Sequence, residues 1–492
     1  MEQKHATGIE GLDDILPGGL PRGHLYLIEG EPGTGKTTLA LSFLTTGRHD
    51  ETAALYVTLS ETSAELQMIA ESHELHLDNV ELVELERDLA RHAPENQYTV
   101  FDSTEVELGD TLKAIYSAAE RVKPTRVVID SLSELRLVTR DSLRFRREVL
   151  ALKRFFSNLE ATVLVLDDLS IDAHDRLVQS IAHGVIRLER VTTDFGAERR
   201  RLIVSKLRGS GFREGYHDYR IAKGGLHVFP RLIAAEHKPD KISGQIPNSS
   251  KNLNNLLGGG LERGTSTIMM GPSGVGKSTL AATFAAAAAE NGDKVEILLF
   301  DESLRTYQMR NRALEIGLEP YIEAGTIRVR QIDPAEVSPG ELTYIVRCAV
   351  EKFGAHCLII DSINGMVQAM PGERTLLIQI HELLTYLGQL NVTTIMTLAH
   401  HGMVEGNSSQ ADLSYLADTL ILFRFFEAFG EIKQAISVVK KRTGDHQRGL
   451  HEARFAPGGL AIGDQLKEFV GILTGAPRFV GLEGRLFDAD RG

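Results

Sequence analysis

Short apolar runs rich in β-branched residues alternate along the chain with longer segments whose apolar positions recur every three or four residues. The strand-like runs include LYLIEG at 25–30 and CLIIDS at 357–362. Apolar strands alternating with helices predict a mostly parallel sheet with helices on both faces, and the closely spaced later strands predict an antiparallel edge. One helix face is formed by Phe145, Val149, Leu152, Phe156 and Leu159.

The chain contains this pattern twice. GLDDILPGGLPRG at 11–23 matches NLNNLLGGGLERG at 252–264, an offset of 241 residues. VVIDSLSEL at 127–135 then matches LIIDSINGM at 358–366, an offset of 231, so we expect one half to lack about ten residues in a surface loop. The repeat predicts two tandem α/β domains, residues 1–230 and 251–492, joined by a Pro/Ser/Asn-rich linker at 231–250.

Charge and cysteine content limit the partners and the cellular compartment that we expect for this protein. The chain has 54 Lys and Arg against 67 Asp and Glu, and a net charge of −13 opposes nonspecific binding to nucleic acid or to a membrane. Its two cysteines, Cys348 and Cys357, are typical of a reduced protein, and the longest apolar run is too short to span a bilayer. We expect a cytoplasmic protein that contacts neither membranes nor nucleic acid.

Each half carries the pattern GxxxxGK[ST] between a predicted strand and a predicted helix, at 30–37 and at 271–278. In such a loop, glycines let backbone N–H groups surround phosphates, the lysine neutralises phosphate oxygens, and the hydroxyl ligates Mg²⁺. The sequence therefore predicts two sites for ATP or ADP with Mg²⁺. The predicted nucleotide contacts are Gly33, Thr34, Gly35, Lys36, Thr37 and Thr38 in the first half, and Ser273, Gly274, Val275, Gly276, Lys277, Ser278 and Thr279 in the second.

Carboxylates follow two of the predicted strands in each half. Asp130 and Asp361 end apolar strands, where they would complete Mg²⁺ sites with the hydroxyls of Thr37 and Ser278; capping of the next helix is the alternative. After the second strand come Glu61 in the first half and the pair Asp301 and Glu302 in the second. These acids are candidates to orient or deprotonate the water that attacks ATP, although solvated loop acids would give the same pattern.

The doubled loops, the acids after the second strand, SKLRGS at 205–210 and VKKRTG at 439–444 together resemble the KaiC family of circadian-clock proteins, a branch of the RecA-like P-loop ATPases. The resemblance covers nearly the whole chain. It implies two tandem RecA-like domains that assemble into two stacked tiers in a homo-hexamer, with ATP at every subunit boundary. The resemblance leaves open whether a KaiB-like or other signalling protein binds to this ring.

In that family, the Lys-x-Arg motif of a late strand reaches the nucleotide of the neighbouring subunit. A cation supplied in trans would stabilise charge on the phosphates during hydrolysis, whereas surface charge guarding an edge strand is the alternative reading. The resemblance implies nucleotide contacts at these motifs, and also at two further matched positions. The residues concerned are Lys206, Leu207, Arg208, Lys440, Lys441 and Arg442, with Ser72 and His446 as the further positions.

The resemblance also implies that the first half is an ATPase and that the second half phosphorylates its own chain. The family's modified segment matches QADLSYLADTLILF at 410–423, which places the two positions on Ser414 and Tyr415. The family pattern is Ser-Thr, and the tyrosine oxygen lies further from the backbone, so ordered modification of both sites is not expected. A polar segment preceding a strand is the alternative.

Three departures and two other function classes complete the predictions. The family's paired glutamates are replaced by Ser60 and Glu61 in the first half, and the shorter Asp301 should slow the second half. The tail that binds the activator KaiA in cyanobacteria is short here, so we expect no KaiA control. A DNA-dependent RecA-like or DnaB-like ATPase is the main alternative, and its aromatic and basic strand-binding loop is not evident. A nucleotide-gated scaffold with little turnover is the other.

Overall fold

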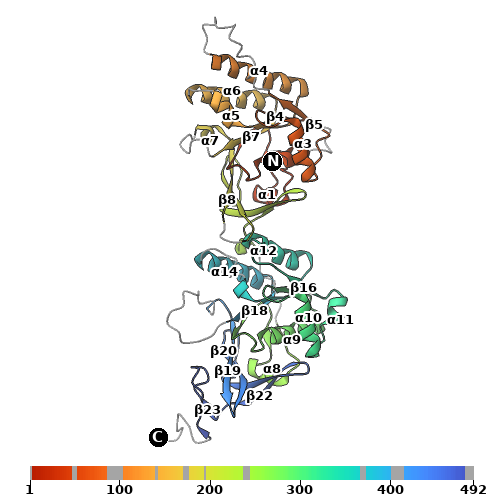
Figure 1. The fold of residues 1–492 in the computed structure, drawn as a ribbon, viewed down its shortest axis with the longest axis vertical. Helices are drawn as coiled ribbons and strands as arrows, with labels where there is room; N and C mark the ends of the chain where they lie inside the picture. Colours follow the sequence, from red (N-terminus) through yellow and green to blue (C-terminus); the bar gives the residue numbers. More distant parts are fainter. Residues whose placement is uncertain are drawn as a thin grey trace. The chain divides into compact units, whose positions relative to one another are not determined.

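The structure is a computed structural model, and it describes residues 3–46, 53–85, 103–138, 142–169, 177–192, 196–236, 244–365, 373–399 and 415–481. Contacts divide the chain into two compact units, Met1–Arg231 and Leu232–Gly492. Figure 1 colours the first unit from red to yellow-green and the second from green to blue. No helix in the described ranges has the length and hydrophobicity needed to cross a membrane.

The first unit alternates strands and helices as far as its eighth strand and then continues as strands alone. Its strands are β1 (Lys4–His5), β2 (Leu20–Pro21), β3 (Leu25–Gly30), β4 (Ala54–Thr58), β5 (Val80–Glu84), β6 (Arg126–Asp130), β7 (Thr162–Asp168), β8 (Gly184–Val191), β9 (Arg199–Leu207), β10 (Tyr216–Ala222) and β11 (Gly225–Phe229). Its helices are α1 (Glu10–Ile15), α2 (Lys36–Thr45), α3 (Ser63–Ser72), α4 (Ser103–Val122), α5 (Leu132–Val138), α6 (Ser142–Asn158) and α7 (Leu177–Ile181).

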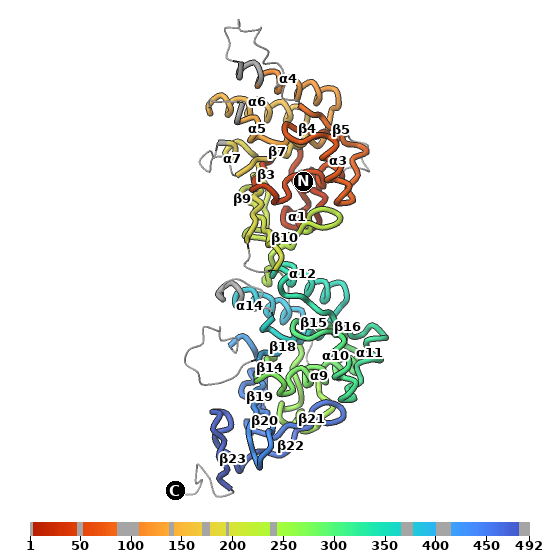
Figure 2. The backbone as a smooth tube through the Cα atoms, viewed as in Figure 1, coloured from red at the N-terminus to blue at the C-terminus, as the bar shows by residue number. Residues whose placement is uncertain are grey.

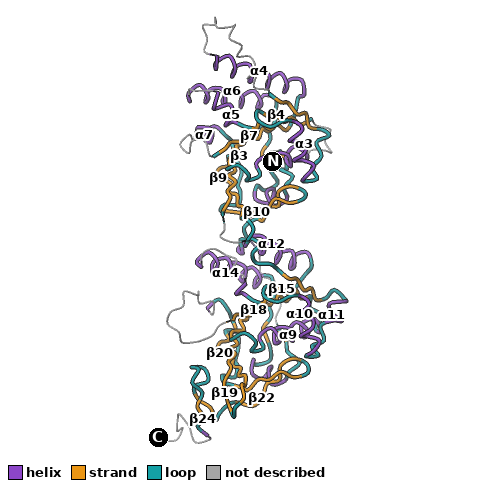
Figure 3. Tube along the Cα trace, viewed as in Figure 1, coloured by secondary structure: helices purple, strands orange, loops and turns teal. Residues whose placement is uncertain are grey.

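The second unit has a similar order of elements, with the additional helix α11 before β16, and Figure 3 colours the helices and strands of both units. Its strands are β12 (Gln245–Ile246), β13 (Leu261–Glu262), β14 (Ser266–Gly271), β15 (Val295–Leu299), β16 (Ile327–Gln331), β17 (Cys357–Asp361), β18 (Thr393–Ala399), β19 (Thr419–Ala428), β20 (Glu431–Lys441), β21 (His451–Ala456), β22 (Gly459–Gln465), β23 (Phe469–Val470) and β24 (Arg478–Phe479). Its helical segments are the 3₁₀ turn η3 (Ala234–Glu236), α8 (Lys251–Leu257), α9 (Lys277–Glu290), α10 (Leu304–Ala313), α11 (Glu319–Glu323), α12 (Pro339–Arg347), the π-turn η4 (Cys348–Lys352) and α14 (Glu373–Gln389).

Each unit is built on one nine-stranded sheet, with the order β5-β4-β6-β7-β3-β8-β9-β10-β11 in the first and β16-β15-β17-β18-β14-β19-β20-β21-β22 in the second. The six strands from β5 to β8 pair in parallel, and β8 to β11 pair antiparallel. The second sheet follows the same rule. The predicted parallel sheet with an antiparallel edge is therefore confirmed in both halves, and Figure 2 traces the chain through each.

Alternate residues of the central strands enter two separate cores. On β3, Leu25 and Leu27 pack with helices α4 to α6, whereas Tyr26 and Ile28 pack with α1 to α3. The period of two along a strand sends successive side chains to opposite faces, which is why these strands are apolar throughout. Four residues of the predicted face, Phe145, Val149, Leu152 and Phe156, are buried on α6, whereas the fifth, Leu159, lies one residue beyond the end of the helix and is half-buried.

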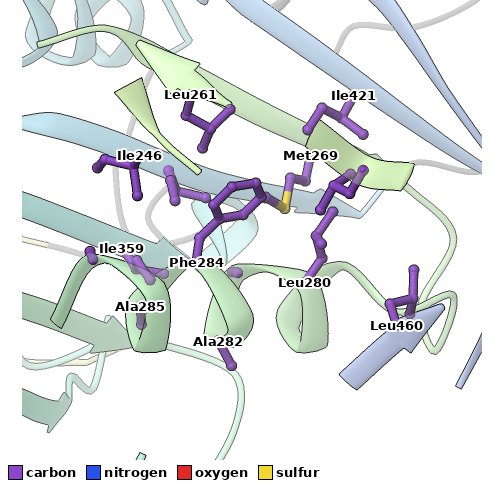
Figure 4. Close-up of a cluster of buried hydrophobic side chains, with 14 of the residues drawn as sticks. Ile246, Leu261, Met269, Leu280, Ala282, Phe284, Ala285, Ile359, Ile421 and Leu460 are labelled. Carbon is purple, nitrogen blue, oxygen red and sulfur yellow. The ribbon is translucent and has the colours of Figure 1, made fainter. Parts of the chain in front are cut away.

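The helix that follows each P-loop is buried on nearly all sides. In α9, eleven of fourteen residues are buried, and in α2 the seven residues from 38 to 44 are. Figure 4 shows Phe284 of α9 directed at the Met269 side chain of the central strand β14. A helix apolar on every side must be enclosed by other elements, so the start of this helix, where the P-loop ends, is held on a rigid base.

The predicted loss of about ten residues from one half is more exactly two changes of opposite sign. Val80 of β5 pairs with Ala54 of β4, and Ile327 of β16 pairs with Val295 of β15. Ala54 and Val295 are equivalent positions of the repeat, so Val80 and Ile327 are equivalent too, and their offset is 247. The second half therefore gains residues around α11 and then lacks a longer stretch before β17, where the offset from β6 is 231 (126 against 357). Sequence matching alone recorded only the sum of the two changes.

The start of the predicted linker at 231–250 packs with the second unit. Leu232 and Ala234 lie in one core cluster with Ile380 and Leu383 of α14, and the backbone N–H of Ala234 donates to Glu382 Oε2 at 3.3 Å. At the other end of the segment, β12 pairs with β13. Residues 237–243, between these two parts, lie outside the described ranges.

Candidate nucleotide sites

Both P-loops lie at the carboxyl edge of the parallel strands. In the first unit the loop joins the end of β3 to the start of α2, and Gly33 and Gly35 have φ angles of 79° and 93°. These left-handed angles favour glycine. A Cβ at Gly35 would also come within 2.7 Å of Ile221 Cδ1 on β10. The glycines therefore let the loop pass tightly under the β10–β11 hairpin and leave the N-terminus of α2 facing an anion site.

The two P-loop lysines fold back over their own loops. Lys36 Nζ donates to the Gly30 carbonyl oxygen at 2.7 Å, and Lys277 Nζ donates to the carbonyl oxygens of Gly271 and Pro272 at 2.8 and 2.7 Å. Burial lowers the pKa of Lys36, and it lowers the pKa of Lys277 to about 8 against the opposing charge of Asp361. A phosphate group in the loop would favour the charged form of both lysines.

Each P-loop hydroxyl meets the strand-ending aspartate of its own unit. Ser278 Oγ donates to Asp361 Oδ1 at 2.9 Å, and Thr37 Oγ1 donates to Asp130 Oδ2 at a longer 3.5 Å. The hydroxyl of Tyr56 also donates to Asp130 Oδ2, at 2.6 Å. Burial raises the pKa of Asp130, while the Tyr56 hydrogen bond opposes that rise.

These pairs fit Mg²⁺ better than a metal held by protein alone. The described residues contain no group of three or more His, Cys, Asp and Glu side chains that could hold a metal ion. Mg²⁺ takes one or two protein oxygens and completes its shell with water and substrate phosphates. One hydroxyl and one carboxylate beside a phosphate-binding loop are therefore a sufficient protein contribution.

Glu61, which follows β4, is the candidate base of the first site. Burial, with the nearby charges of Asp130 and Glu65, raises the pKa of Glu61 to about 7, and Lys36 opposes the rise. The Glu61 Oε2 atom is buried and has no hydrogen-bond partner among the residues that the structure describes. A carboxyl that titrates near neutral pH and has a free oxygen can accept a proton from water.

The second unit encloses a pocket of about 670 Å³ between its P-loop and α10. There Glu302 Oε2 accepts a hydrogen bond from Arg310 Nη1 at 2.6 Å, and Asp301 accepts one from the hydroxyl of Ser362. Burial raises the pKa of Glu302, and Arg310 opposes the rise. The pocket is lined by Ser273, Gly274, Gly276, Lys277, Ser278, Thr279, Asp301, Glu302, Arg310, Ala313, Leu314, Asp361, Ser362, Thr397, Ala399 and Phe455.

In each unit the Lys-x-Arg motif and the P-loop lie at opposite ends of the parallel strands. The P-loop follows the carboxyl end of the central strand, and the motif lies level with the amino end of that strand, which is called the far edge below. In the first unit, Leu207 between the two cations pairs with Gly184, which pairs with Tyr26 at the start of β3. The P-loop begins at Gly30, four residues further along the strand, or about 13 Å at the usual rise. In the second unit Lys441 pairs with Thr419, which pairs with Thr267 at the start of β14.

The cations of these motifs contact backbone oxygens at that far edge. Lys206 Nζ donates to the carbonyl oxygens of Gln179 and Ala182, both at 2.7 Å, and Arg208 Nη2 donates to that of Ser180 at 3.1 Å. Both strands have a β-bulge beside the motif, where the register shifts after Val185 and after Leu420. Bulges redirect side chains at functional edges, and these cations face away from their own nucleotide loop.

The remaining predicted contacts fall at several places. Ser72 ends α3 and donates to the Ile69 carbonyl oxygen, and His446 is half-buried in the loop after the second motif. Lys441 is buried, with Nζ bonded to the Leu257 carbonyl oxygen, so a nucleotide contact there would use its backbone. Leu207 is likewise buried.

The predicted modification segment is only partly described. Ser414 lies outside the described residues, whereas Tyr415 is described and its side chain is 52% exposed. The Tyr415 carbonyl oxygen accepts a hydrogen bond from Arg442 Nη2 at 2.9 Å. This end of the segment thus contacts the far-edge cation of its own unit.

Sequence reasoning missed several residues that shape the two sites. Tyr56 and Thr397 hydrogen-bond to the strand-ending aspartates from inside apolar strands, where nothing in the sequence marked them. The hydroxyl of Tyr219 donates to the Thr34 carbonyl oxygen at 2.6 Å and supports the first P-loop from β10. Arg310 could have been found, because the 241-residue offset aligns it with an apolar residue, Ile69.

Comparison with known proteins matches this architecture. The family described as "ATPase: KaiC" matches the chain twice, over residues 5–233 and 246–467. The Circadian clock oscillator protein KaiC of a Picosynechococcus species is 26% identical over 98% of this chain and 93% of its own length. The protein of that name in Acaryochloris marina is 25% identical over 98% and 92%, and KaiC 1 of Synechocystis is 24% identical over 98% and 93%. The chain therefore belongs to the KaiC ATPase family, with two RecA-like units in one polypeptide.

Proposed function

We propose that this protein hydrolyses ATP at the boundaries between copies of itself in a six-membered ring, and that its second unit also phosphorylates its own chain. The observation that carries the proposal is the position of the Lys-x-Arg motifs. They lie at the opposite end of the parallel strands from their own P-loop, and this separation supports a role for Lys206 and Arg208 at the nucleotide of a neighbouring copy. The clock names of its relatives suggest a regulatory role for the ring.

The chain's own residues divide the chemistry among them. The P-loop N–H groups and Lys36 would hold the phosphates, and the side-chain oxygens of Thr37 and Asp130 would bind Mg²⁺. Mg²⁺, when bound, supplies positive charge to the phosphate oxygens. Glu61 orients the attacking water and takes its proton as the bond from the γ-phosphorus to the bridging oxygen breaks, releasing ADP and phosphate. Arg208 of the neighbouring copy stabilises charge on the γ-phosphate.

Tyr56→Phe should raise the Mg²⁺ concentration that hydrolysis at the first site requires, by about tenfold or more. The hydroxyl of Tyr56 orients Asp130 at 2.6 Å, and loss of such a supporting hydrogen bond commonly costs about tenfold or more in metal affinity. The measurement is the Mg²⁺ concentration for half-maximal hydrolysis, with Glu302→Gln present to silence the second site. An unchanged Mg²⁺ requirement would show that Tyr56 only fills space.

One contact in the second unit supports the proposal that this unit modifies its own chain. Tyr415 directly follows the predicted site Ser414, and its carbonyl oxygen is bonded to Arg442. If Arg442 reaches the neighbouring nucleotide, its contact with Tyr415 brings this end of the segment to the subunit boundary. In the proposed transfer, the hydroxyl oxygen of Ser414 forms a bond to the γ-phosphorus as the bond to ADP breaks, and the hydroxyl proton passes to water. This arrangement supports transfer across the subunit boundary.

Incubation with Mg·ATP followed by mass spectrometry of residues 410–420 tests the transfer. We expect phosphate on Ser414 and its loss in Ser414→Ala. Protein that hydrolyses ATP but carries no phosphate on this segment would reject the kinase role and leave the ATPase role standing.

Electron microscopy with and without ATP tests the ring itself. Six-membered particles that form with ATP are expected, because nucleotide at each boundary adds contacts between copies. Stimulation of hydrolysis by single-stranded DNA would instead favour a DNA motor. Against that alternative, Arg200 and Arg201 of the basic run at 199–201 are paired with Glu198 and Glu189.

A further inference from the structure

The helix that follows the candidate base has the same length and the same capping pattern in the two units, so its positions can be compared one by one. Both α3 and α10 have ten residues and follow a hydroxyl cap, Thr62 or Ser303, whose side chain accepts the N–H of the third helical residue. The 241-residue offset is kept through both helices. The same helical position is therefore Ile69 in the first unit and Arg310 in the second.

Arg310 has one acceptor. Its Nη1 donates to Glu302 Oε2 at 2.6 Å, whereas its Nε and Nη2 atoms are buried and have no hydrogen-bond partner among the described residues. Both side chains are mostly buried, with 26% and 21% exposure. Breaking the pair would leave the guanidinium with no hydrogen-bond acceptor among the described residues and with only the Tyr307 ring, whose centroid is 5.2 Å away, to compensate its charge, which makes the contact hard to release.

Among the described residues, Glu61 is not hydrogen-bonded to a cation, although the charge of Lys36 acts on its carboxyl group. An apolar isoleucine occupies the matching helical position, and Glu61 Oε2 is buried without a hydrogen-bond partner in the part of the chain that the structure describes. Its carboxylate can therefore turn toward a water molecule without first giving up an ion pair. Glu302 borders the same pocket as Lys277 and Ser278, but one of its oxygens is already engaged.

We propose that Arg310 is a positioning residue that holds Glu302 in an ion pair, called the latch below, and thereby slows hydrolysis at the second site. At the first site Ile69 occupies the same position and forms no such pair with Glu61. The inference rests on the proposed function, because it assumes that both glutamates act on the water that attacks ATP. The charge-assisted hydrogen bond engages Oε2 of Glu302, and the positive charge of Arg310 makes the carboxylate a weaker base, so proton transfer from this water is slower while the ion pair is intact. The second site thus keeps its ATP longer, and the phosphoryl group stays available for transfer.

The test measures ATP turnover by the full-length chain with Glu61→Gln present, so that the second site accounts for the remaining hydrolysis. We expect Arg310→Met to raise kcat about tenfold with little change in KM, because it removes the ion pair and keeps the length of the side chain. Adding Glu302→Gln should abolish the gain, since the effect acts through that carboxylate. Arg310→Lys, which keeps a cation within reach, should stay near the parent rate.

The matched variant lies in the other unit. With Glu302→Gln present, Ile69→Arg should install the missing latch and lower kcat at the first site by about tenfold. If Arg310→Met does not fold, judged by its melting temperature, this arm decides the question alone.

An Arg310→Met variant that is slower or unchanged would overturn the latch, and so would a gain that survives Glu302→Gln. These outcomes differ from failure of the proposed function. If the proposed function fails, the unaltered chain hydrolyses no ATP, and the Glu61→Gln and Glu302→Gln parents hydrolyse none either.

Discussion

Arg208→Ala should lower kcat for ATP hydrolysis at the first site by about a thousandfold. The guanidinium would be the cation that a neighbouring copy contributes to the γ-phosphate, and the P-loop of its own unit lies at the other edge of the sheet. Nucleotide binding should change little, because Lys36 and the loop backbone remain. The measurement is steady-state hydrolysis by full-length protein with Glu302→Gln present, together with ATP affinity.

The matched control is Arg22→Ala. Arg22 is an exposed arginine of the same unit whose side chain donates to Gln3 Oε1 at 3.2 Å, and it takes no part in the proposed chemistry. We expect its rate to equal that of the parent. If Arg208→Ala hydrolyses ATP as fast as this control, the far-edge cation does not act on nucleotide.

Glu61→Gln should reduce first-site hydrolysis by at least about a hundredfold, because a positioned general base contributes this much or more. The unaltered site should also depend on pH in a defined direction. The pKa of Glu61 is raised to about 7, so the carboxylate is protonated below that pH and cannot accept a proton. The rate should therefore fall as the pH drops through about 7 and level off above it.

The measurement is kcat between about pH 5.5 and pH 8.5, with Glu302→Gln present in every sample. The residual rate of Glu61→Gln should lose the inflection near 7. As a control, Glu74→Gln alters an exposed acid that pairs with Lys223, and it should leave the profile in place. A profile that keeps its inflection without Glu61 would assign the titration to another group.

Local patterns were enough to predict the repeated sheet and the two nucleotide loops. Strands such as β3 and β14 are continuous apolar runs because both of their faces are covered, and the P-loop signature requires glycines at fixed spacing. The edge strands β5 and β16 escaped notice. Their residues are only partly buried and mix charged with apolar side chains, so neither a continuous apolar run nor a clean alternation appears.

Contacts between distant segments were the part that the sequence could not supply. Tyr56 and Asp130 are 74 positions apart, and only the parallel pairing of β4 with β6 brings the hydroxyl to the carboxylate. The far-edge position of Lys206 likewise depends on strand order, which no local pattern encodes. Arg310 was visible in the repeat, but its ion pair with Glu302 required the structure.

Mixing two inactive variants tests most directly whether each site is shared between copies. One chain carries Arg208→Ala and the other Lys36→Ala, and both carry Glu302→Gln so that only the first site is observed. Each alone should hydrolyse almost no ATP. In a mixed ring, roughly a quarter of the boundaries unite an intact P-loop with an intact arginine, and activity should return. Mixed rings, verified by co-purification through a tag on one chain, that stay as inactive as their parents would contradict the account.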